Sequence, residues 1–166
     1  RKAQTDFRLL DGTRDIWLRD FMPVKTRTGT YVSFRYTPSY LADTPELRTD
    51  YRSDIAPAFS LSVTDSFINL DGGNVVFSPS KEKAVVSDRV FSENPAFDKT
   101  ALLKELEKVL QAQVLVIPSL VSDMTGHADG MVRFVNETTA IGNRVPAKNG
   151  LEQKIKAALW TYSIQV

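Results

Sequence analysis

The sequence has no cysteine among its 166 residues. This absence excludes disulfides, thiolate metal sites and a cysteine nucleophile within these residues. It does not indicate a compartment, because cysteine-free chains occur in oxidising and reducing environments alike. The sequence also has no run of about 18 apolar residues, the length that a membrane span needs. No apolar signal core follows the Arg1–Gln4 start, which we interpret as a processed or artificial boundary. We expect a cytoplasmic protein without a membrane partner.

The chain also lacks an excess of charge of either sign. Lys and Arg total 21 and Asp and Glu total 20, so no net field would attract nucleic acid or an anionic membrane. Apolar residues make up 42% and charged residues 25%, which is the composition of an ordinary globular protein. The length predicts one domain with a sizeable core, and it leaves the oligomeric state open.

The first half of the chain predicts short strands joined by loops. "IWLRDFMPVKTRTGTYVSF" indicates a short apolar strand, a loop with proline and a second strand around residues 31–34. The stretch 36–57 holds three prolines and shows little periodicity, so we expect a long loop of the kind that often carries function. "SFINLDGGNVVFSPSKEKAVV" then predicts a strand, a glycine turn, and two strands at 75–77 and 84–86.

The second half contains the clearest helix. Apolar residues recur at helical spacing over 99–111, and Asp98 or Thr100 can cap the N-terminus. The continuous apolar run 114–120 predicts a strand that is buried on both faces. An amphipathic helix over 151–160 and a strand-like "YSIQV" end the sequence.

Three aspartates occupy similar places in the predicted order of elements. Asp20, Asp71 and Asp129 each stand just before a predicted strand, and successive members are 51 and 58 positions apart. This spacing is compatible with a repeated β-β-α-β unit. It suggests that several acidic groups converge on one centre.

His127, the only histidine, stands between Asp123 and Asp129 in "DMTGHADGMVRF". Taken singly, it is an ordinary polar residue, and each aspartate is an ordinary turn or ion-pair residue; Asp71, for example, could open a turn to which Gly72 and Gly73 supply positive φ. Taken together they suit general acid/base work, because carboxylates can orient an imidazole, and they suit the binding of a planar guanidinium. A metal site built from Asp123, His127 and Asp129 is disfavoured, because the spacing matches no metal motif and a second histidine is missing.

Three segments, taken in order, resemble the agmatine deiminase and bacterial peptidylarginine deiminase family. They are "WLRDFMP" (17–23), "LDGGN" (70–74) and "GHADGMVRF" (126–134), and the resemblance runs from about Thr13 to Asn143. It implies an α/β fold of the pentein type, an α/β-propeller in which β-β-α-β modules surround the active site. Residues 1–166 would then be the N-terminal part of one pentein domain, with about three of its five modules.

The resemblance also implies the chemistry and a role for each motif residue. A cysteine thiolate attacks the guanidinium carbon, ammonia leaves, and water releases a ureido product, without metal or organic cofactor. Asp20, Asp129 and Trp17 would bind the guanidino substrate. His127 would move protons with Asp71 and Asp129 as catalytic partners, although many members have glutamate at the place of Asp71. A last group of motif residues would have structural roles, namely Gly72, Gly73, Asn74 and Gly126.

The family's nucleophilic cysteine lies near the C-terminus, beyond the segments that resemble this chain. The leading hypothesis is therefore that the chain is part of a guanidino-group hydrolase. Agmatine is the first candidate substrate and peptidyl arginine is the second. The expected partner is a small cationic guanidino compound. A non-catalytic guanidinium-binding module or pseudoenzyme is the alternative from another functional class.

Overall fold

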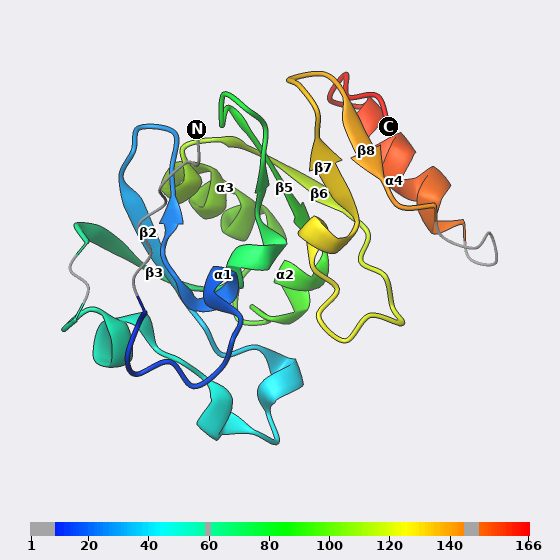
Figure 1. Ribbon diagram of the computed structural model, residues 1–166. Helices are drawn as coiled ribbons and strands as arrows, with labels where there is room; N and C mark the ends of the chain where they lie inside the picture. Colours follow the sequence, from blue (N-terminus) through cyan, green and yellow to red (C-terminus); the bar gives the residue numbers. More distant parts are fainter. Residues whose placement is uncertain (1–8, 59–60, 145–149) are drawn as a thin grey trace, which may run out of the picture.

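The computed structural model describes residues 9–58, 61–144 and 150–166 (Figure 1). The Arg1–Gln4 start lies outside the described residues. In chain order the elements are α1 (Leu18–Phe21), β1 (Val24–Lys25), β2 (Tyr31–Arg35), η1 (Ser39–Leu41), η2 (Pro45–Leu47), η3 (Tyr51–Ile55), β3 (Val63–Asn69), η4 (Gly72–Asn74), β4 (Val76–Phe77), β5 (Lys83–Ser87), α2 (Arg89–Ser92), α3 (Lys99–Leu110), β6 (Gln113–Ile117), η5 (Ala128–Gly130), β7 (Val132–Phe134), β8 (Ala140–Gly142) and α4 (Leu151–Trp160).

The strands form three small sheets that repeat one pattern. β1 pairs antiparallel with β2, and β2 pairs parallel with β3. β4, β5 and β6 repeat this order. In the third sheet β7 pairs antiparallel with β8, and a parallel bridge joins Thr139 to Gln165 beyond α4. The second unit, built on β4, β5 and β6, thus has the full expected β-β-α-β order. In the first unit the turns η1, η2 and η3 take the place of the helix, and in the third unit a single bridge takes the place of the last strand.

A short helical turn precedes the first strand of each sheet, and each turn carries or adjoins one of the three spaced aspartates. Asp20 lies in α1, Asp71 is the residue before η4, and Asp129 lies in η5. The predicted apolar strand at the start of "IWLRDF" is wrong, because residues 18–21 form α1. The three aspartates thus occupy similar places in the structure as well as at similar intervals in the sequence.

The second unit contains the helix with the strongest sequence signal. The Asp98 carboxylate caps α3 by accepting hydrogen bonds from the backbone N–H groups of Thr100 and Ala101. The helix ends one residue earlier than predicted, where Gln111 takes a left-handed conformation. It packs on the central sheet, which consists of β4, β5 and β6, through the apolar stripe formed by Leu102, Leu106 and Leu110.

The central sheet is covered on both faces, as the apolar run 114–120 predicts. Ala84, Val86 and Val114 pack toward α3, whereas Val85 and Leu115 pack toward β7, β8 and α4. This alternation follows from the two-residue period of a strand. Strand β6 is shorter than predicted and ends at Ile117; the next residue is Pro118, which has no backbone N–H for a sheet ladder.

The stretch 36–57 is more ordered than the predicted long loop. It forms two 3₁₀ turns, η1 and η2, and a π turn, η3. These turns bury Tyr36, Leu41, Tyr51 and Ile55 against Phe21 in a separate small core. Without a regular helical period this core could not be recognised in the sequence, because the partners of its apolar residues are set by tertiary contacts.

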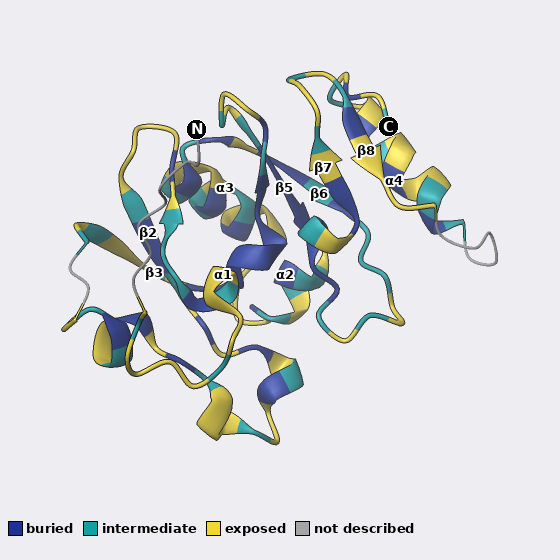
Figure 2. Ribbon diagram, viewed as in Figure 1, coloured by how far each residue is buried: buried dark blue, intermediate teal, exposed yellow. Residues whose placement is uncertain are grey.

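The third unit lies at the C-terminal side of the molecule (Figure 1). α4 packs Leu151, Ile155 and Leu159 onto the core that it shares with β7 and β8 (Figure 2). The predicted "YSIQV" strand is represented by the single bridge at Gln165. Across the described ranges, no helix has the length and apolar character needed to span a membrane.

Candidate active site

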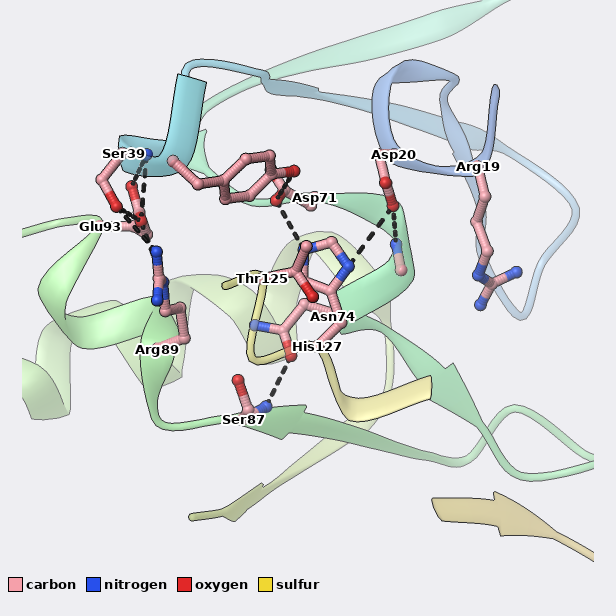
Figure 3. A network of polar contacts seen from close by, with 12 residues as sticks. Arg19, Asp20, Ser39, Asp71, Asn74, Ser87, Arg89, Glu93, Thr125 and His127 are labelled. Carbon is pink, nitrogen blue, oxygen red and sulfur yellow. Dashed lines mark hydrogen bonds and ion pairs between the residues drawn. The ribbon is translucent and has the colours of Figure 1, made fainter. Parts of the chain in front are cut away.

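The turns before the strands bring side chains from all three motifs into one buried cluster (Figure 3). His127 precedes η5, and its Nε2 lies 2.7 Å from Oδ2 of Asp71. On the other side of the ring, Nδ1 lies 3.7 Å from Oδ1 of Asp20. His127 is 6% exposed and Asp71 is 8% exposed, so bulk water does little to screen these charges. The ring is therefore placed between two carboxylates that lie 51 positions apart in the sequence.

The surrounding charges favour the protonated ring. Burial alone would lower the pKa of His127, but the hydrogen bond and charge of Asp71, with the charges of Asp20 and Asp129, raise the pKa above its ordinary value. Burial raises the pKa of Asp20, because it disfavours the charged carboxylate. The nearby imidazole of His127 and the N–H of Gly73 act in the other direction but do not outweigh burial. The cluster can thus hold and release a proton, and its carboxylates favour a cation at this site.

Two glycines permit the turns to approach one another. A Cβ on Gly72 would stand 1.9 Å from the carbonyl oxygen of Arg19. A Cβ on Gly73 would stand 2.5 Å from Oδ1 of Asp20 and 2.6 Å from Nδ1 of His127. Neither glycine has positive φ, which excludes the alternative of an ordinary tight turn with positive φ at these positions. Glycine is needed here because backbone passes directly against the reactive groups.

Asn74 holds the turn before β7 against the central sheet. Its side-chain oxygen accepts hydrogen bonds from the backbone N–H groups of Ser87 at 2.8 Å and Ala128 at 3.1 Å. Ala128 follows His127 directly, so Asn74 helps to fix the backbone position of His127. Gly126, on the other side of His127, adopts a φ of +60°, which favours glycine.

Asp129 stands beside the cluster and pairs with a residue that the sequence did not single out. Its Oδ2 lies 3.3 Å from Nε of Arg19, and Arg19 also donates a hydrogen bond of 2.7 Å to the carbonyl of Val75. Asp129 still acts on the cluster through its charge, which raises the pKa values of His127 and Asp20.

Trp17 and Asp123 do not join the hydrogen-bonded cluster. Trp17 precedes α1 and is 59% exposed. Asp123 accepts hydrogen bonds from the backbone N–H and the hydroxyl of Thr125. Within the described residues, no three or more His, Cys, Asp or Glu side chains form a group that could hold a metal ion.

Tyr40 contacts the cluster from the irregular stretch after β2. Its hydroxyl donates a hydrogen bond of 2.8 Å to Oδ2 of Asp71, and its ring meets the His127 ring edge-on at 6.1 Å. The sequence carries no motif or period that would single out Tyr40. Only the general expectation that a long loop carries function pointed to this region.

The repeating order of strands in the small sheets is that of a pentein-type α/β fold. The sequence model of the Porphyromonas-type peptidyl-arginine deiminase family matches residues 7–159. Because the match covers most of the chain, the chain belongs to this family. No curated protein matches the sequence.

Solved structures of agmatine deiminases share the fold. The C. jejuni enzyme superposes with a TM-score of 0.70 at 17% identity, over 91% of this chain and 49% of that chain. The Enterococcus faecalis enzyme superposes with a TM-score of 0.60 at 18% identity, over 88% of this chain and 44% of that chain. A C. jejuni variant with a cysteine replaced by serine, solved with substrate bound, gives a TM-score of 0.65 at 16% identity, over 90% of this chain and 49% of that chain. The chain thus spans about half the length of the structures it matches.

Proposed function

We propose that this chain supplies the proton-transfer and guanidinium-binding half of a deiminase active site. The observation that carries the proposal is the buried imidazole held between Asp71 and Asp20, at 2.7 Å and 3.7 Å. A histidine in this position can take up and release protons near neutral pH. Family membership supports the same chemistry, because the members are guanidino-modifying hydrolases.

Agmatine is the proposed substrate. Its guanidinium is resonance-stabilised and therefore a poor electrophile, so it must be bound and aligned before attack. Asp20 and Asp129 would accept hydrogen bonds from its nitrogens, and Trp17 would contact the substrate beside them. For Asp129 this requires Arg19 to share or leave the carboxylate. The likeness in fold to several agmatine deiminases supports this choice.

The reaction requires a thiolate, which residues 1–166 do not contain. We propose that a cysteine outside these residues forms a bond to the guanidinium carbon. The carbon–nitrogen bond then breaks, and His127 donates the proton with which ammonia leaves. A water molecule next gives a proton to His127 and attacks the same carbon, the carbon–sulfur bond breaks, and N-carbamoylputrescine is released. No metal or organic cofactor takes part in these steps.

Peptidyl arginine is the second candidate substrate, because the chain belongs to the Porphyromonas-type peptidyl-arginine deiminase family. Its guanidino group presents the same chemistry to Asp20, Asp129 and His127. The two substrates differ only at the far end, where agmatine is a small amine and peptidyl arginine is a polypeptide. The residues that separate them would contact that far end.

Ammonia release by the whole protein tests the proposal with agmatine, a peptidyl-arginine substrate and free arginine compared side by side. We expect turnover of agmatine with and without EDTA, and no turnover by residues 1–166 alone. Exclusive turnover of the peptide would select the second candidate. Turnover that EDTA abolishes, or no turnover of any guanidino compound, would overturn the proposal. Sequencing the gene beyond Val166 tests for the required cysteine.

A further inference from the structure

The Asp71 carboxylate receives two polar contacts on the same oxygen. The Tyr40 hydroxyl donates to Oδ2 at 2.8 Å, and Nε2 of His127 lies 2.7 Å from that atom. Two donors can share one oxygen when the carboxylate is ionised, because it is then an acceptor only. With Asp71 ionised, Nε2 is the donor in this contact, and the neutral ring then keeps Nδ1 free to accept a proton.

Asp20 competes for the opposite arrangement. If the neutral ring carried its proton on Nδ1, the acceptor on that side would be Oδ1 of Asp20, which lies 3.7 Å away. Asp20 is held at this distance in part by a hydrogen bond of 2.9 Å from the backbone N–H of Gly73. The two carboxylates thus favour opposite tautomers of one ring, and the difference between their distances decides which prevails.

Tyr40 is built into the fold as a fixed donor. Ser39, its neighbour in η1, donates a hydrogen bond of 2.6 Å from its hydroxyl to Oε1 of Glu93, and its backbone N–H donates to the same carboxylate. Arg89 pairs with Glu93 at 3.2 Å and donates to the Ser39 hydroxyl, which ties η1 to α2 (Figure 3). Burial and the charge of Asp71 raise the pKa of Tyr40 far above its ordinary value, so the hydroxyl keeps its proton.

We propose that Tyr40 is a positioning residue that holds the ionised Asp71 carboxylate against Nε2 of His127 and so leaves Nδ1 as the proton-transfer atom. This inference rests on the proposed function, in which His127 moves protons beside the guanidinium. Nδ1 is the ring atom that faces Asp20, one of the carboxylates proposed to bind the substrate. A ring with the other tautomer would present an N–H at this place and could not accept a proton there.

The single histidine makes the tautomer directly measurable. In chain 1–166 labelled with ¹⁵N, one imidazole contributes signals, and a protonated ring nitrogen has a different ¹⁵N shift from an unprotonated one. The spectra are recorded above the pKa of His127, where the ring is neutral. A hydrogen bond to a charged group predicts an excess of the Nε2–H form of at least about tenfold in the wild type.

Tyr40→Phe tests the role of the hydroxyl, and Tyr162→Phe is the matched control. Tyr162 packs against the core of the third unit, away from Asp71. We expect Tyr40→Phe to reduce the Nε2–H excess several-fold, because Asp71 then loses the donor that orients it, and we expect the control to keep the wild-type ratio. A mixture of tautomers in the wild type, or an unchanged ratio in Tyr40→Phe, would overturn the inference.

A second variant keeps the test decisive if Tyr40→Phe fails to give a folded amide spectrum. Asp71→Asn replaces the ionised acceptor with a neutral amide, and the same loss of the Nε2–H excess is expected. Retention of the wild-type ratio in Asp71→Asn would overturn the inference. Because the spectra need no substrate, a failure of the tautomer prediction is separate from a failure of ammonia release by the whole protein.

Discussion

The first and second repeating units connect their parallel strands in different ways. Between β5 and β6, the connection is made by α2 and the regular, capped helix α3. Between β2 and β3, the connection consists of η1, η2 and η3, three short turns around a small separate core. The regular connection covers one face of the central sheet, whereas the irregular one delivers Tyr40 to Asp71. In these two units the regular helix buries an apolar stripe on the sheet, and the irregular stretch supplies a side chain to the candidate active site.

The largest expected effect is a loss of ammonia release that occurs with substitutions in the candidate active site and not with a substitution on α3. In the whole protein, His127→Ala should reduce ammonia release from agmatine by at least about 10²–10⁴-fold, because the proton-transfer group is lost. Asp20→Asn should cost about 10²–10³-fold, because one charge opposite the guanidinium is removed. The control is Lys104→Ala on the exposed side of α3, which should leave turnover unchanged. Full activity of His127→Ala would remove His127 from the mechanism.

The next effect compares the two cores in residues 1–166 by urea unfolding. Leu106 in α3 is 0% exposed, and Leu106→Ala should lower the free energy of unfolding by about 2–5 kcal/mol. Leu41 belongs to the smaller core around η1 and is 8% exposed, so Leu41→Ala should fall at or below the low end of that range. An equal loss for both variants would mean that the irregular stretch contributes to global stability as much as α3 does.

A smaller effect is a pH dependence of the free energy of unfolding, which arises from His127 in the candidate active site. The pKa of His127 is raised in the folded chain, so the stability it contributes is fully present below its ordinary pKa of about 6.5 and is lost as pH rises through the folded pKa. The slope in that window is at most about 1.4 kcal/mol per pH unit. Urea unfolding across this window should show the loss in the wild type and a flatter profile in His127→Gln. A wild-type stability that rises through the window relative to His127→Gln would contradict the assigned charges.

The smallest effects compare the caps of the two connections. Asp98 accepts two backbone hydrogen bonds at the start of α3, and Asp98→Ala should lower the free energy of unfolding by about 1 kcal/mol. Asp50 caps η3 by accepting from the backbone N–H of Ser53, but it stabilises a turn of only five residues. Asp50→Ala should therefore cost less than Asp98→Ala. Asp98→Asn should restore most of the loss, and a failure to do so would argue against capping.

The helix α3 and the central strands could be predicted from the sequence because their signals are local. A cap, a 3.6-residue apolar stripe and a continuous apolar run each depend on neighbours within one element. Residues 18–21 were assigned wrongly as a strand, because one turn of apolar and charged residues is too short to show a period. The strand at residues 162–166 was overestimated for the same reason.

The candidate site could be predicted only in part. The order and spacing of the three aspartates and His127 pointed to convergence, and the structure places Asp20, Asp71 and His127 in one buried cluster. Their roles remain proposals. The Arg19–Asp129 pair and the Tyr40–Asp71 hydrogen bond join residues that are far apart in the chain, and no local pattern marks such pairs.

The sequence by itself therefore determined the family, the helix α3 with the strands on either side of it, and Asp20, Asp71 and His127 as candidates for the proposed chemistry. These properties depend on short segments whose residue types and spacing can be recognised in the sequence alone. The tertiary structure alone decided which oxygen meets which nitrogen of His127, why Gly73 has no room for a side chain, and which tyrosine supports Asp71. Such contacts depend on distances of 2.7 to 3.7 Å between atoms of separate turns, and only the packing of the three sheets sets those distances.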